Sequence, residues 1–241
     1  MKLYDLFKRR PATIKSELSQ APAESSTYRF IGNDTVKEMV EHALEGREYG
    51  CRVIKGGNTK VTLEYTLNDI KTTINGDVIF PKIYVTNAEM PGTALKFSVG
   101  MLRLVCSNGM MAGTSFYSEK IIHRQGQTFE DKYEMVAEKI QEAVAYLEDT
   151  FASDMEEMVA DSVTEAQAIE IIGNSNVPTK VKHEAIYRWF NPKRFADAQE
   201  DVWSLYNILN EAITDAVKSP QARLAYNQHL LRDITDLKTA C

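Results

Sequence analysis

The chain has 241 residues, 44% of them hydrophobic, which is enough to bury a sizeable core in one large domain or in a domain with a helical extension. The formal charge of −6 argues weakly against nucleic acid as a partner, and no apolar run approaches the roughly 18 residues that cross a bilayer. Three cysteines without metal-ligand spacing fit a reducing compartment. We therefore expect a protein of the host cytoplasm, without membrane contact, metal or cofactor.

The charge is unevenly distributed along the chain. Residues 51–125 carry nine Lys and Arg against five Asp and Glu, whereas residues 126–175 carry two against thirteen. An ordinary solvated helix face explains such an acidic segment, and so does a surface that docks on a basic partner. The sequence leaves both interpretations open.

The N-terminal part of the chain divides into an arm, a helix and a β-rich region. We expect a flexible arm over residues 1–26, where a Pro/Ala/Ser stretch follows a short amphipathic piece. Apolar residues at helical spacing predict a helix over residues 35–45, with Asn33 or Asp34 as its N-cap. Short β-prone runs separated by turn residues then extend over residues 51–124, which favours an antiparallel meander.

Two features of the β-rich region have definite structural consequences. Pro81 has no N–H to donate, so it should lie at an edge or a bulge of the sheet. The stretch RLVCSNGM over residues 103–110 leads an apolar strand directly into Asn108-Gly109, the dipeptide best suited to a two-residue turn with positive φ. We therefore expect a hairpin whose turn is made by these two residues.

After Gln125 the pattern becomes helical and stays so. The architecture we expect is α+β: a helix plus an antiparallel β-meander sheet over residues 27–125, then a multi-helix C-terminal half over residues 126–241 that packs on the sheet. The expected helices of this half cover residues 128–151, 154–161, 164–172, 179–190, 195–218 and 219–237.

Two segments resemble the phage/plasmid-like protein family of unknown function. One fits the family's R-x-V-C-S-N-G signature and the other its C-terminal W-x-x-Y-N segment, in the expected order and about 100 residues apart. The resemblance implies a phage- or plasmid-encoded protein but no defined activity. The residues that carry it are Arg103, Cys106, Ser107, Asn108, Gly109, Trp203, Tyr206 and Asn207.

The net-positive β-rich region interleaves cations with aromatic rings, as single-strand binders do. If both share one face, the cations hold phosphates and the rings stack on bases; if strand alternation separates them, the rings belong to the core. Trp203, Tyr206 and Asn207 form a helical stripe that is either packing or a binding surface. The residues we expect to bind nucleic acid are Lys96, Arg103, Lys120, Arg124, Phe97, Phe116 and Tyr117.

Catalysis is not expected, because the histidines stand alone, no base is placed near Cys106, and no glycine-rich phosphate loop occurs. We expect a non-enzymatic homo-oligomer that binds single-stranded nucleic acid, DNA more than RNA, and anneals strands in recombination or replication. The alternative is a counter-defence protein whose acidic helix binds a host protein. A third interpretation is a structural accessory protein that assembles through its C-terminal helices.

Overall fold

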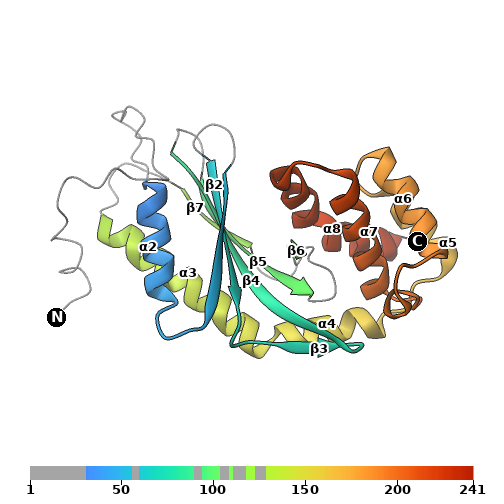
Figure 1. Cartoon of the computed structure of the whole chain (residues 1–241), viewed down its shortest axis with the longest axis horizontal. Helices are drawn as coiled ribbons and strands as arrows, with labels where there is room; N and C mark the ends of the chain where they lie inside the picture. The colour runs from blue at the N-terminus through green and yellow to red at the C-terminus, as the bar shows by residue number, and fades with distance from the viewer. Residues whose placement is uncertain are drawn as a thin grey trace.

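The computed structural model describes residues 31–55, 60–89, 94–103, 109–110, 118–122 and 129–240, so the expected arm over residues 1–26 lies outside it. The architecture is α+β, an antiparallel sheet followed by helices, as the sequence predicts. Figure 1 shows the sheet in the middle of the molecule, with α2 (Asn33–Ala43) and α3 (Phe129–Asp149) on one side and the C-terminal helices on the other.

Seven strands of the described chain form one sheet, and each strand pairs antiparallel with its neighbours. The order is β1-β2-β4-β5-β6, with β3 also paired to β4 and β7 also paired to β5. The predicted meander is confirmed. The strands are β1 (Tyr49–Lys55), β2 (Lys60–Leu67), β3 (Thr72–Ile74), β4 (Asp77–Ala88), β5 (Ala94–Arg103), β6 (Gly109–Met110) and β7 (Ser118–Ile122).

The expected turn at Asn108-Gly109 is wrong, although β5 and β6 do form an antiparallel pair. The pairing places Gly109 opposite Leu102, so Gly109 is a strand residue and the chain reverses between these two positions. Asn108 lies outside the described residues. The turn chemistry of an Asn-Gly pair is used instead between β3 and β4, where Asn75 and Gly76 have φ of 48° and 84°, as a two-residue hairpin turn requires.

Pro81 does not lie on an edge strand, because β4 is flanked on both sides. On one side it stands opposite Met101 of β5. On the other side it falls between Ile79, which pairs with β3, and Lys82, which pairs with β2. Pro81 has no N–H to donate to a neighbouring strand. The central strand β4 tolerates it, because on one side Pro81 lies between the residues that pair with β3 and those that pair with β2.

Helix α2 begins earlier than expected and is not capped by its own side chains. It starts at Asn33, with Gly32 in the N-cap position and no side-chain cap, so neither Asn33 nor Asp34 is the N-cap. The backbone N–H of Asn33 donates instead to Glu89 Oε1 at 2.6 Å, and Asn87 Nδ2 donates to Asn33 Oδ1 at 3.0 Å. Residues at the end of β4 therefore satisfy the start of this helix.

The expected helix over residues 195–218 is divided in two. Asp201 ends an extended stretch and caps the second part, since its Oδ1 accepts from Ser204 N–H at 2.6 Å. The N–H of Val163 donates to Glu200 O at 2.9 Å, which ties this stretch to the chain before α5. The helical elements after α3 are α4 (Phe151–Ala160), α5 (Glu165–Asn174), α6 (Thr179–Phe190), the 3₁₀ turn η1 (Phe195–Asp197), α7 (Val202–Ala216) and α8 (Pro220–Ala240).

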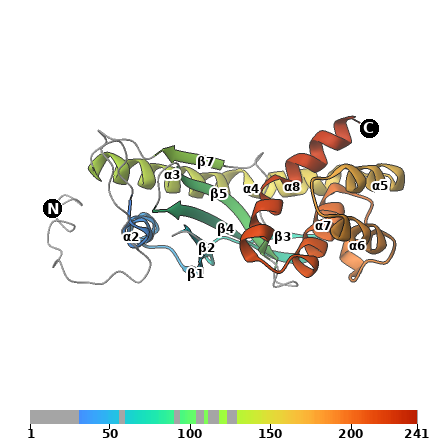
Figure 2. The ribbon, with the colours of Figure 1, turned by 90° about the horizontal axis from the view of Figure 1, so that it is seen from above.

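The core lies between one face of the sheet and helices α2 and α3, and it continues into the C-terminal helices. Val36 and Met39 of α2 and Ile140 of α3 are fully buried there. Helices α3 and α4 run along the bottom of Figure 1 from the sheet half to the helical half, and Figure 2 shows the same connection from above. Every residue of α7 from Val202 to Ile213 is buried.

Candidate nucleic-acid interface

The two faces of the sheet differ in chemistry. The inner face packs against α2 and α3 and is apolar; it contains Leu63, Tyr65, Ile83, Val85, Leu95, Phe97 and Val99, all buried. The opposite face, which we call the outer face, is polar, because strand residues alternate between the two faces. Its described members include Arg52, Lys60, Thr62, Glu64, Lys82, Tyr84, Thr86, Lys96 and Ser98.

The side chains of Phe97 and Lys96 lie on opposite faces of the sheet. The ring of Phe97 is 0% exposed on the inner face, whereas Lys96 is exposed on the outer face. The expectation that Phe97 stacks on bases is therefore wrong. Neighbouring residues of a strand point to opposite faces, and the apolar ring takes the side that α3 covers.

A row of lysines and hydroxyls crosses the outer face from strand to strand. Thr62 pairs with Thr86, Thr86 with Lys96, and Lys96 with Lys120. The two threonine hydroxyls are 2.9 Å apart. Exposed Lys60 lies on the same face of β2, two residues before Thr62. Like charges at paired positions are unfavourable in a sheet unless an anion compensates them, so this row is suited to binding one.

The other residues expected to bind nucleic acid are not gathered in this row. Arg103 stands opposite Ile79, which is buried on the inner face, so its backbone position is not aligned with that of Lys96. Of Arg103 and Lys120 the structure describes the backbone. Arg124, Phe116 and Tyr117 lie outside the described residues, as do three residues of the family signature, Cys106, Ser107 and Asn108.

The carboxylate of Glu64 is neutralised within the outer face. Lys82 Nζ donates to Glu64 Oε1 at 2.8 Å, and Arg52 donates to Glu64 Oε2 at 2.8 Å. Burial lowers the pKa of Lys82, which Glu64 opposes by favouring the charged ammonium. Burial, then Glu64 and then Tyr206 of α7 raise the pKa of Tyr84.

The stripe on α7 is a packing stripe. Trp203, Tyr206 and Asn207 are each at most 1% exposed, which favours the packing interpretation over a binding surface. Several of its polar atoms nevertheless have no hydrogen-bond partner among the described residues: the indole Nε1 of Trp203 and both amide atoms of Asn207 and Asn210. Buried polar groups left unpaired in this way cost stability.

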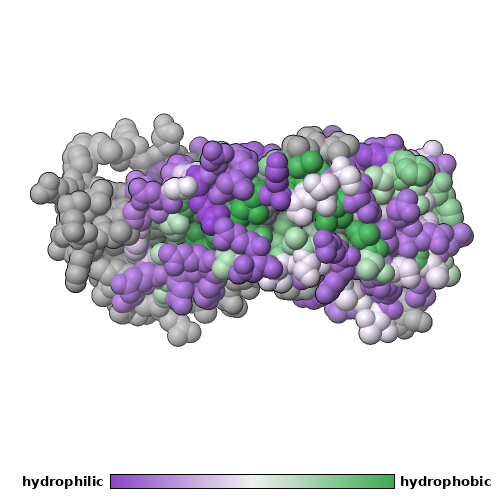
Figure 3. Space-filling view, turned by 90° about the horizontal axis from the view of Figure 1, so that it is seen from below, coloured by the Kyte–Doolittle hydropathy of each residue, from purple (hydrophilic) through white to green (hydrophobic). Residues whose placement is uncertain are grey.

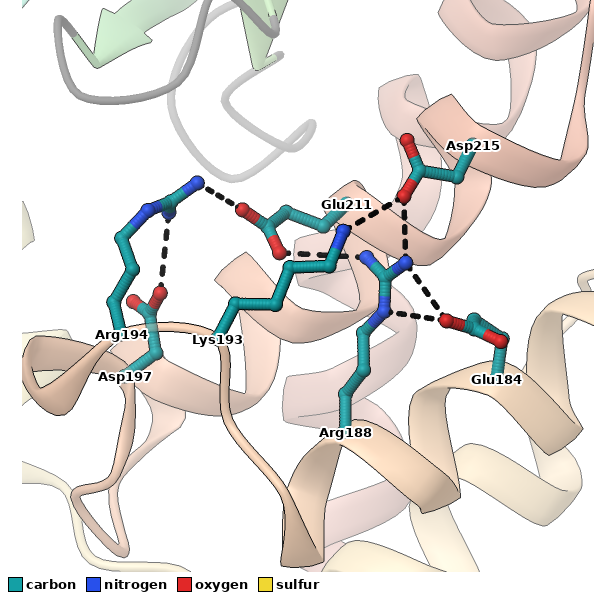
Figure 4. Close-up of polar contacts among 7 residues, drawn as sticks. All are labelled: Glu184, Arg188, Lys193, Arg194, Asp197, Glu211 and Asp215. Carbon is teal, nitrogen blue, oxygen red and sulfur yellow. Dashed lines mark hydrogen bonds and ion pairs between the residues drawn. The ribbon is translucent and has the colours of Figure 1, made fainter.

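A charged cluster that the sequence analysis missed joins α6, the connection after it and α7 (Figure 4). Arg188 is 3% exposed and donates to Glu184, Glu211 and Asp215 at 2.8, 3.3 and 2.6 Å. Arg194 also pairs with Glu211. The one sequence signal is the spacing of four between Glu184 and Arg188. The full cluster is Glu184, Arg188, Lys193, Arg194, Asp197, Glu211 and Asp215.

Among the residues whose burial the structure describes, the exposed aromatic rings occur beside this cluster. Tyr187, Phe190 and Phe195 are 63%, 51% and 88% exposed, and we call them the α6–η1 corner. Figure 3 shows hydrophobic surface in the half that holds the C-terminal helices. The sequence analysis missed these rings, because helical spacing does not reveal which of two apolar stripes a neighbour covers.

Within the described part of the chain, His, Cys, Asp and Glu form no group of three or more that could hold a metal ion. None of the helices there is both long and apolar enough to span a bilayer. The geometry on which a functional proposal can rest is therefore the outer face and the α6–η1 corner.

Comparison with known proteins identifies the family of this chain. A family model described as a domain of unknown function, DUF932, covers residues 23–235. No solved structure matches the chain. The family match extends over the sheet and nearly all of the helical half, so it includes both the outer face and the α6–η1 corner. The chain therefore belongs to the DUF932 family, whose function is unknown.

Proposed function

We propose that this protein binds single-stranded nucleic acid, DNA more than RNA, through the outer face of the sheet and without catalysing a reaction. The observation that carries the proposal is the excess of positive charge there. Glu64 is the one carboxylate at the described strand positions of this face, while Asp77 and Glu119 occupy inner-face register positions. The cations at outer-face positions are Arg52, Lys60, Lys82, Lys96 and, by register, Lys120.

The exposed members of this set are free to contact phosphate. Lys60 and Lys96 are exposed, and neither pairs with a carboxylate in the described part of the chain. Arg52 is 63% exposed and lies beside Glu64, whose charge Lys82 already balances. Phosphates attract such cations and release counterions when they bind, which makes the affinity strongly dependent on salt. Because the protein as a whole carries a net charge of −6, the excess of positive charge on the outer face does not follow from a basic composition.

Fluorescence anisotropy with a labelled single strand over a salt series tests the proposal. We expect a shift at low salt that weakens as salt rises. The double variant Lys60→Gln/Lys96→Gln should reduce the slope of log affinity against log salt by about 1.4, since each phosphate contact on a single strand contributes about 0.7. Lys71→Gln, an exposed lysine outside the strands, is the matched control and should leave the slope unchanged. An absence of salt-sensitive binding by the wild type refutes the proposal.

Strand annealing by an oligomer is the finer form of this proposal. A protein that anneals must hold two strands at once, which copies of one chain can do. Measuring the mass in solution with and without an oligonucleotide, together with the rate at which complementary strands pair, tests it. Unchanged mass and an unchanged pairing rate leave simple binding as the function.

A second candidate function has its own supporting observation. Helices α3 and α4 expose a series of carboxylates along their length, which suits docking on a basic host protein. The charge reversal of Glu134, Glu138, Glu142 and Asp149 to Lys should abolish such docking and should preserve or strengthen nucleic-acid binding. The exposed carboxylates are Asp131, Glu134, Glu138, Glu142, Glu148, Asp149, Glu156 and Glu157.

A further inference from the structure

We infer that the α6–η1 corner is a stacking platform for the bases of the bound strand. The inference rests on the proposed function and specifies which rings contact the bases, a role the sequence had assigned to rings of the β-rich region. Tyr187, Phe190 and Phe195 are 63%, 51% and 88% exposed, whereas Phe97 is fully buried. Large exposed apolar patches often mark sites of interaction.

Two of the three rings lie on one side of α6. Tyr187 and Phe190 are three residues apart at the end of α6, so they lie on the same side of the helix. Phe195 follows after a short connection and begins η1. The end of α6 is fixed, because both the backbone N–H and the side-chain Nδ2 of Asn191 donate to Tyr187 O at 3.0 Å.

The charged cluster holds this platform rigid. Arg188 lies between the two rings of α6 in sequence and its side chain is bound to Glu211 and Asp215 of α7. Arg194, directly before Phe195, is bound to Glu211 as well. The backbone that carries the three rings is therefore fastened to α7, which is buried from Val202 to Ile213. Figure 4 shows the ion pairs that make this connection. Rigid aromatic side chains lose little conformational entropy on binding, which favours affinity.

Lysines near the start of α6 favour nucleic acid as the occupant. Lys180 is exposed and precedes Tyr187 by seven residues, so it lies on the same side of the helix. The carboxylate of Glu184, three residues before Tyr187, is bound by Arg188. Lys182 Nζ donates to Gly173 O at 2.7 Å, and neither Lys180 nor Lys182 has a carboxylate partner in the described part of the chain. An apolar protein partner would bury these ammonium groups without compensation. Phosphates beside stacked bases would compensate them.

A comparison of an ordinary and an abasic oligonucleotide tests the inference. Phe195→Ala should weaken binding of the ordinary single strand about tenfold, and Tyr187→Ala with Phe195→Ala by more, because base stacking on one ring is of this size. Neither variant should weaken binding of an abasic strand of equal length, which has phosphates but no bases. Tyr187→Phe keeps the ring and is the matched control, and it should bind like the wild type.

Four results overturn the inference, and they are distinguishable. Equal weakening on ordinary and abasic strands would mean that the rings contribute only to structure. Unchanged affinity with a reduced mass in solution would make the corner a contact between copies of the chain. If the wild type binds the ordinary strand and all variants bind equally well, this inference fails while the proposed function stands; if the wild type binds no strand at any salt, both fail.

Discussion

Replacing Arg188 by Met should destabilise the folded protein measurably. Its guanidinium is 3% exposed and donates to three carboxylates, of which Glu211 is buried while Glu184 and Asp215 are about half exposed. Removing one partner of a buried pair costs roughly 3–5 kcal/mol. In the variant the ion pair between Glu211 and Arg194 remains. We therefore expect the free energy of unfolding to fall by about 3 kcal/mol, at the lower end of that range.

Urea unfolding followed by circular dichroism measures this loss at pH 7. Lys193→Met is the matched control: it removes a half-exposed cation from the same cluster, and its loss should stay below about 1 kcal/mol. A loss for Arg188→Met no larger than that of the control would refute the reasoning that the cluster fastens α6 to α7.

Lowering the pH should weaken the same interaction, because acid protonates Asp215. Its hydrogen bond from Arg188, and then that from Lys193, hold the pKa of Asp215 below its ordinary value of 3.8. A lowered pKa in the folded state favours folding above pH 3.8, and this contribution is lost as the pH falls through the folded-state value. The difference in stability between the wild type and Arg188→Met should therefore shrink below about pH 4.

Three further substitutions test local parts of the account, each by thermal or urea unfolding. Asp201→Ala removes the cap of α7 and should cost about 1 kcal/mol, and Asp201→Asn should recover most of it. Gly76→Ala should cost about 1 kcal/mol, because Gly76 has φ of 84° and a Cβ there meets no neighbour, so the cost is conformational. Asn210→Leu should raise stability by about 1 kcal/mol, since both amide atoms are buried and unpaired; a loss would show that ordered water satisfies them.

The order of elements follows closely from the sequence where local signals are strong. Helix α6 has the bounds that the apolar spacing predicts, and α5 begins after Thr164, which forms a capping box with Gln167. The division of the expected helix over residues 195–218 depends on the backbone hydrogen bond from the N–H of Val163 to the carbonyl of Glu200, which lie far apart in the chain. Such long-range bonds leave no periodic trace, so hydrophobic spacing alone predicts one continuous helix.

The candidate site was less predictable than the fold. The alternation of Lys96 and Phe97 follows from strand geometry, yet which face is covered depends on where α2 and α3 pack. The exposure of Phe195 and the burial of Trp203 likewise depend on helix packing and not on local pattern. Sequence periodicity identifies apolar stripes, but tertiary contacts decide which stripe stays in solvent.

Lysine footprinting of the bound complex tests the central claim most directly, because it locates the ligand on the protein. The protein is acetylated with and without a saturating single strand, and the modified lysines are identified by mass spectrometry. We predict that Lys60 and Lys96 on the outer face become protected while Lys71 stays equally reactive. Equal reactivity of Lys60 and Lys96 in the bound and free protein would contradict the account.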